Sequence, residues 1–506
     1  MTGAAGTSGR GTGSDGTGRD RAGRQRGRAR AAGASSRTSQ APAQRRRSGD
    51  PARTAAFDVL REVGGSDAYA NLVLPPLLRS REITGRDAGF ATELAYGALR
   101  MQGRYDVMIA QAADRPTTAI DAPVLDVLRL GVHQLQAMRV PPHAAVSETV
   151  ALARARVGAG PAQFVNAVLR AIAAAASEVW LERVADAAGA DPLARLAAVQ
   201  SHPQWIARAL RQALAAHGRD PEEIEALLRA NNDAAAVALA VRPGLMDPDQ
   251  IVAGVRGARR GRWSPTAVVL AGGGDPSGIA ELRQGLVGVQ DEGSQLVTLA
   301  LAEAGLDGPD ARWLDLCAGP GGKSALLGGL AALRHAHLVA VEVAPHRALL
   351  VERAVAGLPA GTVDVRCADG RYVGRDEPGT YDRVLLDAPC TGLGALRRRP
   401  EARWRRTPGD LTGLTTLQGE LLDSALDAVR PGGVVAYVTC SPHVAETRLV
   451  VADALRRRAD VVQVDAVDAV RRVAVQDLPL KDGLEVQLWP HVHGTDAMHL
   501  ALLRRT

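Results

Sequence analysis

The first part of the chain repeats apolar residues at the spacing of a helix. Near its start, Ala56, Val59, Leu60 and Val63 fall on one helical face. Similar stripes recur through residues 51–175, separated by prolines, and the alternation typical of strands is absent. We therefore expect an all-helical domain over residues 51–175.

From about residue 290 the pattern changes to short apolar runs that alternate with helical segments. Such alternation predicts a parallel sheet with helices on both faces. The predicted strands are 312–317, 338–343, 363–367, 383–386 and 434–438, and the predicted helices are 323–334, 347–357 and 411–429.

The two regions are joined by a segment of mixed character. Residues 176–200 are rich in alanine and predict a helical linker. A helical run to Leu214 and short strands at 236–241 and 267–270 then predict a small α+β domain over residues 201–289. Residues 290–506 form the last predicted domain.

The charge is distributed unevenly along the chain. Residues 1–50 hold 11 Arg and 3 Asp, a surplus of +8, so the remaining residues carry −2 of the total of +6. This Gly-, Ser- and Arg-rich arm predicts disorder. Two interpretations stay open, because a basic arm can attract nucleic-acid phosphates or simply keep the protein soluble.

Composition excludes several classes of protein. With 506 residues, 46% hydrophobic, the chain predicts two or three folded domains rather than a disordered protein. No run approaches the roughly 18–20 apolar residues of a membrane span, and no secretory signal is visible. The four cysteines predict no disulfide framework, and no cluster has zinc spacing, so we expect a cytoplasmic protein without a metal.

A glycine-rich loop follows the first strand of the last domain. Its sequence, Asp315-Leu-Cys-Ala-Gly-Pro-Gly-Gly-Lys323, lets the backbone approach a ligand at a helix N-terminus. A P-loop is excluded because Cys317 occupies its first glycine position. The dinucleotide fingerprint is also incomplete, because Ser324 stands at its third glycine position.

Three acidic residues end successive predicted strands. Asp315 can bind an amino group, Glu342 a ribose diol and Asp369 an adenine amino group. Carboxyl ends of parallel strands line the ligand side of an open sheet. Each acid alone is more typical of a turn, but the three in register favour S-adenosylmethionine.

Two cysteines follow the next two strands. The strand ends read Leu386-Asp-Ala-Pro-Cys390 and Tyr437-Val-Thr-Cys-Ser-Pro442, and the prolines fix the turns that aim the thiols. Cys367 lies within a strand and is predicted to be a core residue. Thiols beside a methyl donor suit methylation of carbon 5 of a pyrimidine, since a thiolate added to carbon 6 makes carbon 5 nucleophilic.

The same pattern favours cytosine as the base. Asp387 can bind the exocyclic amino group or protonated N3 of cytosine, and uracil has no amino group there. The base must leave its stack to be reached. Arg397-Arg-Arg-Pro-Glu-Ala-Arg-Trp404 follows directly and predicts an RNA contact through arginines on phosphates and stacking on Trp404; an ordinary solvated face is the alternative.

These motifs resemble those of the RNA cytosine-C5 methyltransferases. The resemblance rests on the glycine loop, Asp387-Ala-Pro-Cys390, the Arg397–Trp404 segment and Thr439-Cys-Ser441. Residues 164–170 are similar to a NusB domain, and 201–205 and 290–294 to the region before the catalytic domain. The chain is thus identified as a member of the RsmB/Sun/Fmu family, which methylates small-subunit ribosomal RNA.

The resemblance implies a multi-domain fold, with an all-α NusB-like domain, a small α+β domain and a C-terminal α/β Rossmann-like class I methyltransferase domain. It implies that Cys440 is the nucleophile and that Cys390 assists product release, whereas DNA cytosine methyltransferases attack with a Pro-Cys cysteine. The implied cofactor site comprises Cys317, Ala318, Gly319, Pro320, Gly321, Gly322, Lys323, Glu342, Asp369 and Asp387.

The resemblance also implies ribosomal RNA as the partner, with no membrane, and we expect a monomer. Two other functions stay open at this point. One is the same chemistry on tRNA, and the other is a NusB-like RNA-binding or antitermination protein with a degenerate methyltransferase domain. Arg399 departs from the family, in which His is frequent at this position.

Overall fold

The computed structural model describes residues 50–66, 68–271 and 276–506. The predicted basic arm therefore lies, apart from Asp50, outside the described residues. Residues 48–506 belong to one compact unit, and the contacts reported below are all within it.

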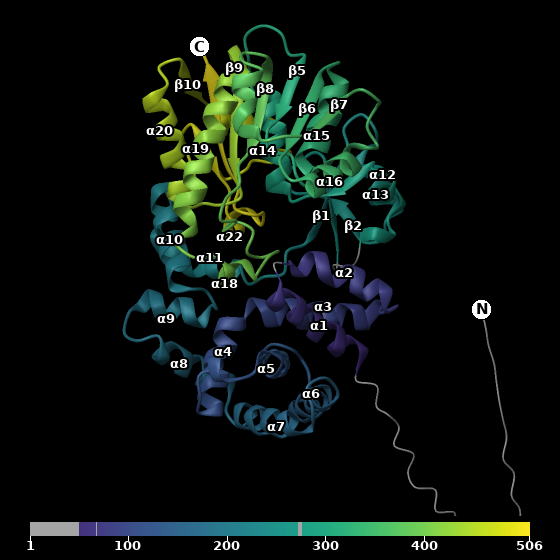
Figure 1. The fold of residues 1–506 in the computed structure, drawn as a ribbon, viewed down its shortest axis with the longest axis vertical. Coiled ribbons are helices and arrows are strands. Elements are labelled where there is room, and N and C mark those ends of the chain that lie inside the picture. The colour runs from purple at the N-terminus through teal and green to yellow at the C-terminus, as the bar shows by residue number, and fades with distance from the viewer. Residues whose placement is uncertain (1–49, 67, 272–275) are drawn as a thin grey trace, which may run out of the picture. The chain divides into compact units, whose positions relative to one another are not determined.

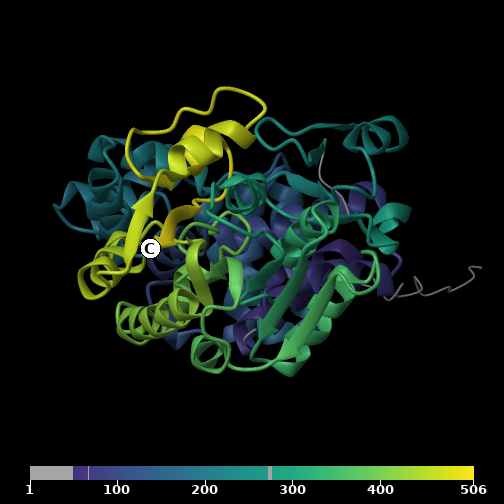
Figure 2. The same ribbon diagram turned by 90° about the horizontal axis from the view of Figure 1, so that it is seen from above.

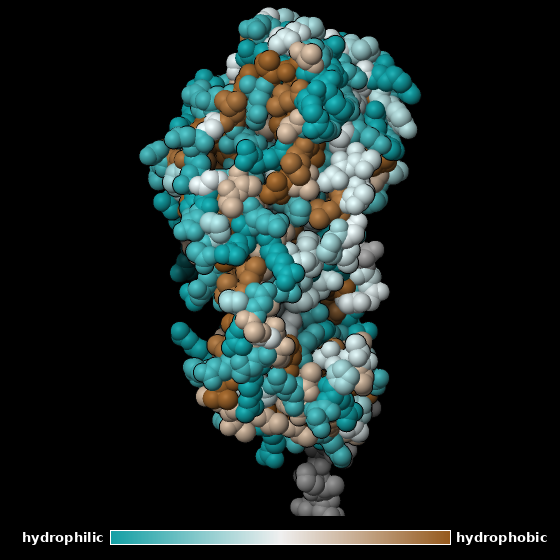
Figure 3. All heavy atoms as spheres, turned by 90° about the vertical axis from the view of Figure 1, so that its left-hand side faces the viewer, coloured by the Kyte–Doolittle hydropathy of each residue, from teal (hydrophilic) through white to brown (hydrophobic). Residues whose placement is uncertain are grey.

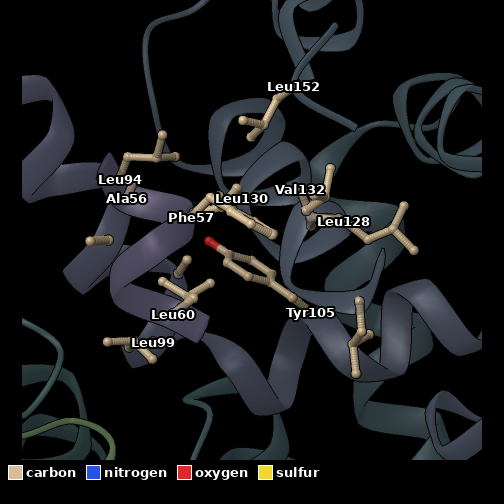
Figure 4. Packing of buried hydrophobic residues seen from close by; sticks show 14 of the residues in the cluster. Ala56, Phe57, Leu60, Leu94, Leu99, Tyr105, Leu128, Leu130, Val132 and Leu152 are labelled. Atoms are coloured by element: carbon tan, nitrogen blue, oxygen red, sulfur yellow. The ribbon is translucent and has the colours of Figure 1, made fainter. Parts of the chain in front are cut away.

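The N-terminal part is helical, as predicted (Figure 1). Asp50 caps the first helix by accepting a hydrogen bond from the Arg53 backbone N–H at 3.0 Å. The helices pack around one core, in which buried Tyr105 lies among leucine side chains and its hydroxyl contacts His133 Nδ1 at 2.8 Å (Figure 4). They are α1 (Pro51–Gly65), α2 (Ala70–Ser80), α3 (Gly85–Arg100), α4 (Gln102–Ala113), α5 (Ala122–Gln136), α6 (Pro142–Arg156) and α7 (Ala159–Ala173).

Four more helices lead towards the sheet-bearing part: α8 (Ser177–Ala187), α9 (Pro192–Val199), α10 (Gln204–Ala216) and α11 (Ile224–Ala230). The segment predicted as a helical linker forms α8 and α9. Trp180 and Val184 of α8 are buried in the core of the helical domain, whereas Ala197 of α9 packs with α10. Burial of these side chains ties the segment to both of its neighbours.

A small antiparallel sheet follows, with strand order β2-β3-β1-β4. Both strands predicted in this region are present. The elements are β1 (Val237–Val241), α12 (Pro248–Gly254), β2 (Ala258–Arg260), β3 (Ala267–Leu270), α13 (Ala280–Arg283) and β4 (Val287–Val289).

The C-terminal part contains an eight-stranded sheet of order β10-β12-β9-β8-β5-β6-β7, in which β11 also pairs with β12. The five predicted strands are confirmed and run parallel. Three antiparallel strands at the C-terminus were not predicted. The strands are β5 (Arg312–Asp315), β6 (His337–Glu342), β7 (Val363–Cys367), β8 (Tyr381–Asp387), β9 (Val429–Thr439), β10 (Val461–Val464), β11 (Glu485–Gln487) and β12 (His499–Arg505).

Helices cover both faces of the large sheet, as predicted (Figure 2). One face packs against α14, α15 and α21, and the other against α19 and α20, each through a separate apolar core. The helices are α14 (Glu292–Glu303), α15 (Gly322–Leu333), α16 (Pro345–Val355), α17 (Val373–Asp376), α18 (Ala402–Arg405), α19 (Asp410–Ala428), α20 (Arg448–Arg457), α21 (Ala466–Val473) and α22 (Pro490–His493).

The face that carries α8–α10 and α20 is mainly hydrophilic, with apolar side chains in small groups (Figure 3). Among the described residues, no single helix is both long and apolar enough to cross a membrane. The bent pair of α7 and α8 reaches that length and composition only when its two helices are taken together.

Candidate active site

The glycine loop connects β5 to α15 and lies against the end of β6. The Gly319 backbone N–H donates to Glu342 Oε2 at 3.0 Å, and a Cβ at Gly319 would lie 2.3 Å from that oxygen. Gly321 has φ +101°, in the left-handed region that favours glycine. Two glycines are thus required for the loop to turn tightly against Glu342 and start the helix.

Asp315, at the end of β5, is a buried carboxylate with unused hydrogen-bonding capacity. Its Oδ2 accepts from the Ser324 hydroxyl at 2.6 Å, whereas Oδ1 has no partner among the residues that the structure describes. Burial raises the pKa of Asp315 to about 7, and the nearby charge of Asp387 adds to the increase. A buried carboxyl oxygen without a donor suits a ligand that brings one, such as an ammonium group.

Glu342 ends β6, as predicted, and Asp369 lies just after the end of β7. Glu342 is 3% exposed and also accepts from the Ala344 backbone N–H at 3.0 Å, which fixes its carboxylate at the loop. Asp369 caps a short 3₁₀ turn and pairs with Arg371 at 2.7 Å. Hydrogen bonds from Arg371 lower the pKa of Asp369, so this carboxylate is charged and already has a cationic partner.

The two predicted catalytic thiols are brought together. Cys390 and Cys440 follow the neighbouring strands β8 and β9, and their Sγ atoms lie 3.4 Å apart. Both side chains are partly exposed. The hydrogen bond from Cys390 lowers the pKa of Cys440, and the positive charges of Lys323 and Arg399 act in the same direction. The same contact, together with burial, raises the pKa of Cys390, so Cys440 is the thiol that ionises first.

Lys323 and Asp387 form an ion pair beside the thiols. The Lys323 ammonium donates to Asp387 Oδ2 at 2.8 Å, and the Lys323 side chain is largely buried. Burial alone would lower the pKa of Lys323, but the charge of Asp387 and its hydrogen bond raise it. Lys323 is therefore a fixed cation between the glycine loop and Cys440. Its ion pair with Asp387 was not evident from the glycine motif.

A buried carboxylate that the sequence did not single out connects the two cysteine turns. Glu446 Oε1 accepts from the Thr391 backbone N–H at 2.7 Å, and its Oε2 accepts from the Thr391 hydroxyl at 2.5 Å. Gln418 of α19 donates to Glu446 at 3.3 Å and to the Pro389 carbonyl at 2.8 Å. No spacing rule marks Glu446, because its role depends on the loop fold after Cys440.

The predicted RNA contact through Arg397–Trp404 is wrong for most of this segment. Arg397 and Arg398 bond to the buried carboxylates Asp291 and Asp496, with N–O distances of 2.7–3.9 Å. Arg403 is fully buried and donates to the carbonyls of three segments, at Arg100, Ser201 and Asn231.

Trp404 also packs inside the protein, where its ring fills the space beside Gly103 of α4. The segment is therefore a structural joint between the helical and catalytic domains. The charges of Arg397 and Arg398 are paired with carboxylates, and Arg403 is held by hydrogen bonds to carbonyls. Arg399 alone among these arginines is exposed.

Two further predictions concern single cysteines. Cys367 was predicted to be a core residue, and this is wrong, because it is exposed at the end of the sheet's edge strand β7. Cys317 lies in the glycine loop and is partly buried. Burial raises the pKa of its thiol well above the usual range, so Cys317 stays protonated and lines the loop rather than acting as a nucleophile.

Family models match the two parts of the chain separately. Residues 306–504 match the model described as 16S rRNA methyltransferase RsmB/F, and residues 50–174 match the NusB family. The second match covers the helices α1–α7, and the first covers the glycine loop and both thiols.

Curated relatives extend over most of the chain. A Mycobacterium tuberculosis protein named as a methyltransferase is 53% identical over 461 residues, which is 91% of this chain and 98% of that protein. Ribosomal RNA small subunit methyltransferase B of Pseudomonas putida is 35% identical over 398 residues, 77% of this chain and 85% of that protein.

Among solved structures, the crystal structure of PH0851 covers 90% of this chain and 99% of its own, with a TM-score of 0.74. Its sequence identity is 20%, so it shows a shared fold.

Proposed function

This chain belongs to the 16S rRNA methyltransferase RsmB/F family of S-adenosylmethionine-dependent RNA methyltransferases, and we propose that it methylates carbon 5 of a cytosine in 16S ribosomal RNA. The observation that carries the proposal is the thiol pair, 3.4 Å apart at adjacent strand ends, in which Cys440 has the lower pKa.

The residues around the glycine loop fit S-adenosylmethionine. Asp315 offers a buried oxygen without a donor, and Glu342 is fixed at the loop with a carboxylate suited to a ribose diol. The proposed cofactor residues are 317–323, Glu342, Asp369 and Asp387, and Asp369 would have to share its carboxylate with Arg371. When bound, the cofactor supplies an electrophilic methyl group.

Cys440 acts as the nucleophile in this proposal. Its thiolate forms a bond to carbon 6 of the base, and the electron pair of the carbon 5–carbon 6 double bond makes carbon 5 nucleophilic. The Lys323 cation stabilises the thiolate before attack. After methylation, a base, either water or the Cys390 thiolate, accepts the carbon 5 proton. The electron pair of the broken C–H bond restores the carbon 5–carbon 6 double bond, and the carbon 6–sulfur bond breaks to release Cys440 as a thiolate; Cys390, in contact with Cys440, assists this release.

Asp387 would hold the cytosine edge. Its Oδ2 bonds to Lys323, so its position is fixed, and its side chain is 28% exposed and accessible to a base. A carboxylate accepts from the cytosine amino group or protonated N3, and uracil offers no amino group there. The base enters single-stranded or flipped out, because a stacked base cannot reach a partly buried thiol.

The proposal includes the predicted division of the chain. Residues 1–50 form a basic arm, 51–175 the NusB-like RNA-binding domain, 176–200 a linker, 201–289 the small α+β domain and 290–506 the methyltransferase domain. Matches at residues 50–174 and 306–504 support this division.

Bisulfite sequencing of RNA from a deletion strain tests the substrate. We expect one methylcytosine to disappear from 16S ribosomal RNA and to return with the wild-type gene but not with Cys440→Ala. An unchanged ribosomal map would contradict the proposal, and a methylcytosine lost from tRNA would assign the same chemistry to that RNA.

A further inference from the structure

Arg399 differs from the other arginines of the joint. It lies in the turn that leads from Cys390 to α18 and is exposed. Its guanidinium carbon is 4.9 Å from the ring centroid of Tyr69, the N-cap residue of α2 in the helical domain. Arg405 lies 5.2 Å from the same ring, so two cations pack against one tyrosine.

The hydrogen-bonding groups of Arg399 are unused. Arg397, Arg398 and Arg403 are bonded to carboxylates or carbonyls, and Arg405 donates to the carbonyls of Val63 and Ala68 at 2.6 Å. Within residues 50–66, 68–271 and 276–506, the Arg399 guanidinium forms no hydrogen bond and no ion pair. Contact with Tyr69 leaves the edge of the planar guanidinium available.

The turn that carries Arg399 is anchored at both ends. At one end the Gly394 N–H donates to the Cys440 carbonyl at 2.9 Å, and the Arg399 N–H donates to Ala395 at 3.0 Å. At the other end Glu401 accepts from the Ala70 N–H at 2.9 Å. The loop that carries Arg399 is therefore held against the Cys440 backbone, and the charge of Arg399 lowers the pKa of the Cys440 thiol.

We propose that Arg399 binds a backbone phosphate of the RNA strand whose base reacts at Cys440, and that Tyr69 positions its guanidinium for this contact. The inference rests on the proposed function. A guanidinium edge binds two phosphate oxygens at once, so a single arginine can fix the strand's register. Tyr69 acts through Arg399 and is a positioning residue, by which the helical domain contributes to the RNA site without touching the base.

Salt dependence separates a phosphate contact from a structural role. Unmethylated 16S ribosomal RNA from the deletion strain is titrated with the full chain across a range of salt concentrations. We expect Arg399→Gln to weaken binding about tenfold and to lower the slope of log K against log salt by about 0.7, the value for one phosphate of a single strand. The KM for RNA should rise more than kcat falls.

Matched variants complete the test. Arg399→Lys should keep the slope, because the charge remains, and recover part of the affinity. Tyr69→Phe should behave as wild type and Tyr69→Leu should weaken binding, since only the former keeps the ring. Arg456→Gln, at the exposed end of α20 and paired with Asp453, should change neither affinity nor slope.

The outcomes distinguish a failure of the Arg399–phosphate contact from a failure of the proposed function. If Arg399→Gln leaves the slope and the KM unchanged while Cys440→Ala is inactive, the phosphate contact is refuted and the proposed function stands. If the wild-type chain neither binds nor methylates the RNA, the phosphate contact and the proposed function are both refuted. A loss of affinity in Arg399→Gln with an unchanged slope would also overturn the inference, because it would indicate a structural effect.

Discussion

The strand ends of the large sheet and the Arg397–Trp404 segment are both dense in charged or reactive side chains, yet they use them in opposite ways. At the strand ends, Asp315 keeps a buried oxygen without a partner and two thiols face each other. In the joint, Arg403 is completely buried and its N–H groups donate to carbonyls of three segments.

The difference lies in unused binding capacity. Burial lowers the pKa of Arg403 to about 9, and among the described residues no carboxylate pairs with it. Both Nη atoms donate hydrogen bonds, which compensate much of the buried charge, and only Nε lacks an acceptor. Asp315 is buried equally well, but only its Oδ2 accepts a side-chain hydrogen bond, from Ser324; its Oδ1 has no partner among the described residues, and a ligand can supply one. The charge of a motif therefore does not by itself indicate a binding site; the polar atoms that lack partners within the protein do.

The largest effect is expected from substituting Cys440. Cys440→Ser should lower methylation more than about a thousandfold, because a serine hydroxyl is far harder to ionise than this thiol. A radiolabelled methyl-transfer assay measures it, with thermal unfolding as the control for folding. Activity within a few fold of wild type would show that the strand ends are not the reacting site.

A substitution of Arg403 tests whether the buried arginines of the joint stabilise the fold. Arg403→Met should destabilise the chain by about 3 kcal/mol, because it leaves buried carbonyls without donors. Urea unfolding measures the loss, and Arg375→Met, at a largely exposed arginine, is the matched control. Activity per folded molecule should persist. If the Arg403→Met chain is as stable as wild type but no longer binds RNA, Arg403 has an RNA-binding role and not the structural role assigned to it here.

A third prediction uses the pKa of Asp315. Since that pKa is raised to about 7, the carboxyl is neutral below pH 7 and charged above it, where it can pair with the cofactor's ammonium. Affinity for S-adenosylmethionine should increase about tenfold per pH unit from pH 5 towards 7 and then level off. Calorimetry measures it, and Asp315→Asn should remove the dependence.

The same shift affects the stability of the cofactor-free chain. The folded pKa of Asp315 is above its unfolded value of 3.8, so its contribution is fully present below pH 3.8 and is lost as the pH rises through about 7. Saturating S-adenosylmethionine should reduce that loss. A pH profile of unfolding that Asp315→Asn leaves unchanged would contradict this account.

The smallest expected effect concerns Glu446, which connects the two cysteine turns. Glu446→Gln should lower kcat about tenfold with the KM for RNA unchanged, because one hydrogen bond to Thr391 is weakened and Cys390 is less well placed. Steady-state kinetics measure the two constants. Thr391→Val, which keeps the backbone N–H, should show a milder decrease.

Much of this arrangement was predictable from the sequence, because local patterns determine it. Apolar runs located the five parallel strands, and strand ends located Asp315, Glu342, Cys390 and Cys440. The side chains that connect these points depend on tertiary contacts. Neither the Lys323–Asp387 pair nor the hydrogen bond that Thr391 donates to Glu446 follows from spacing, since each joins residues more than 50 positions apart.

The wrong predictions have the same origin. Arginines in Arg397–Trp404 were assigned to RNA because their buried partners, Asp291 and Asp496, lie far away in sequence. Cys367 was assigned to the core because nothing local marks β7 as an edge strand. Burial and partners are global properties, and they decide which charges are free to act.

The most direct test of the account is to trap the bond between Cys440 and the base. Cys390→Ala should release its product slowly, so incubation with 16S ribosomal RNA and S-adenosylmethionine should accumulate a covalent complex that survives denaturing gel electrophoresis. The double variant Cys390→Ala/Cys440→Ala should form none. A complex that persists in the double variant, or one that forms with Cys440→Ala alone through Cys390, would contradict the assignment of Cys440 as the nucleophile.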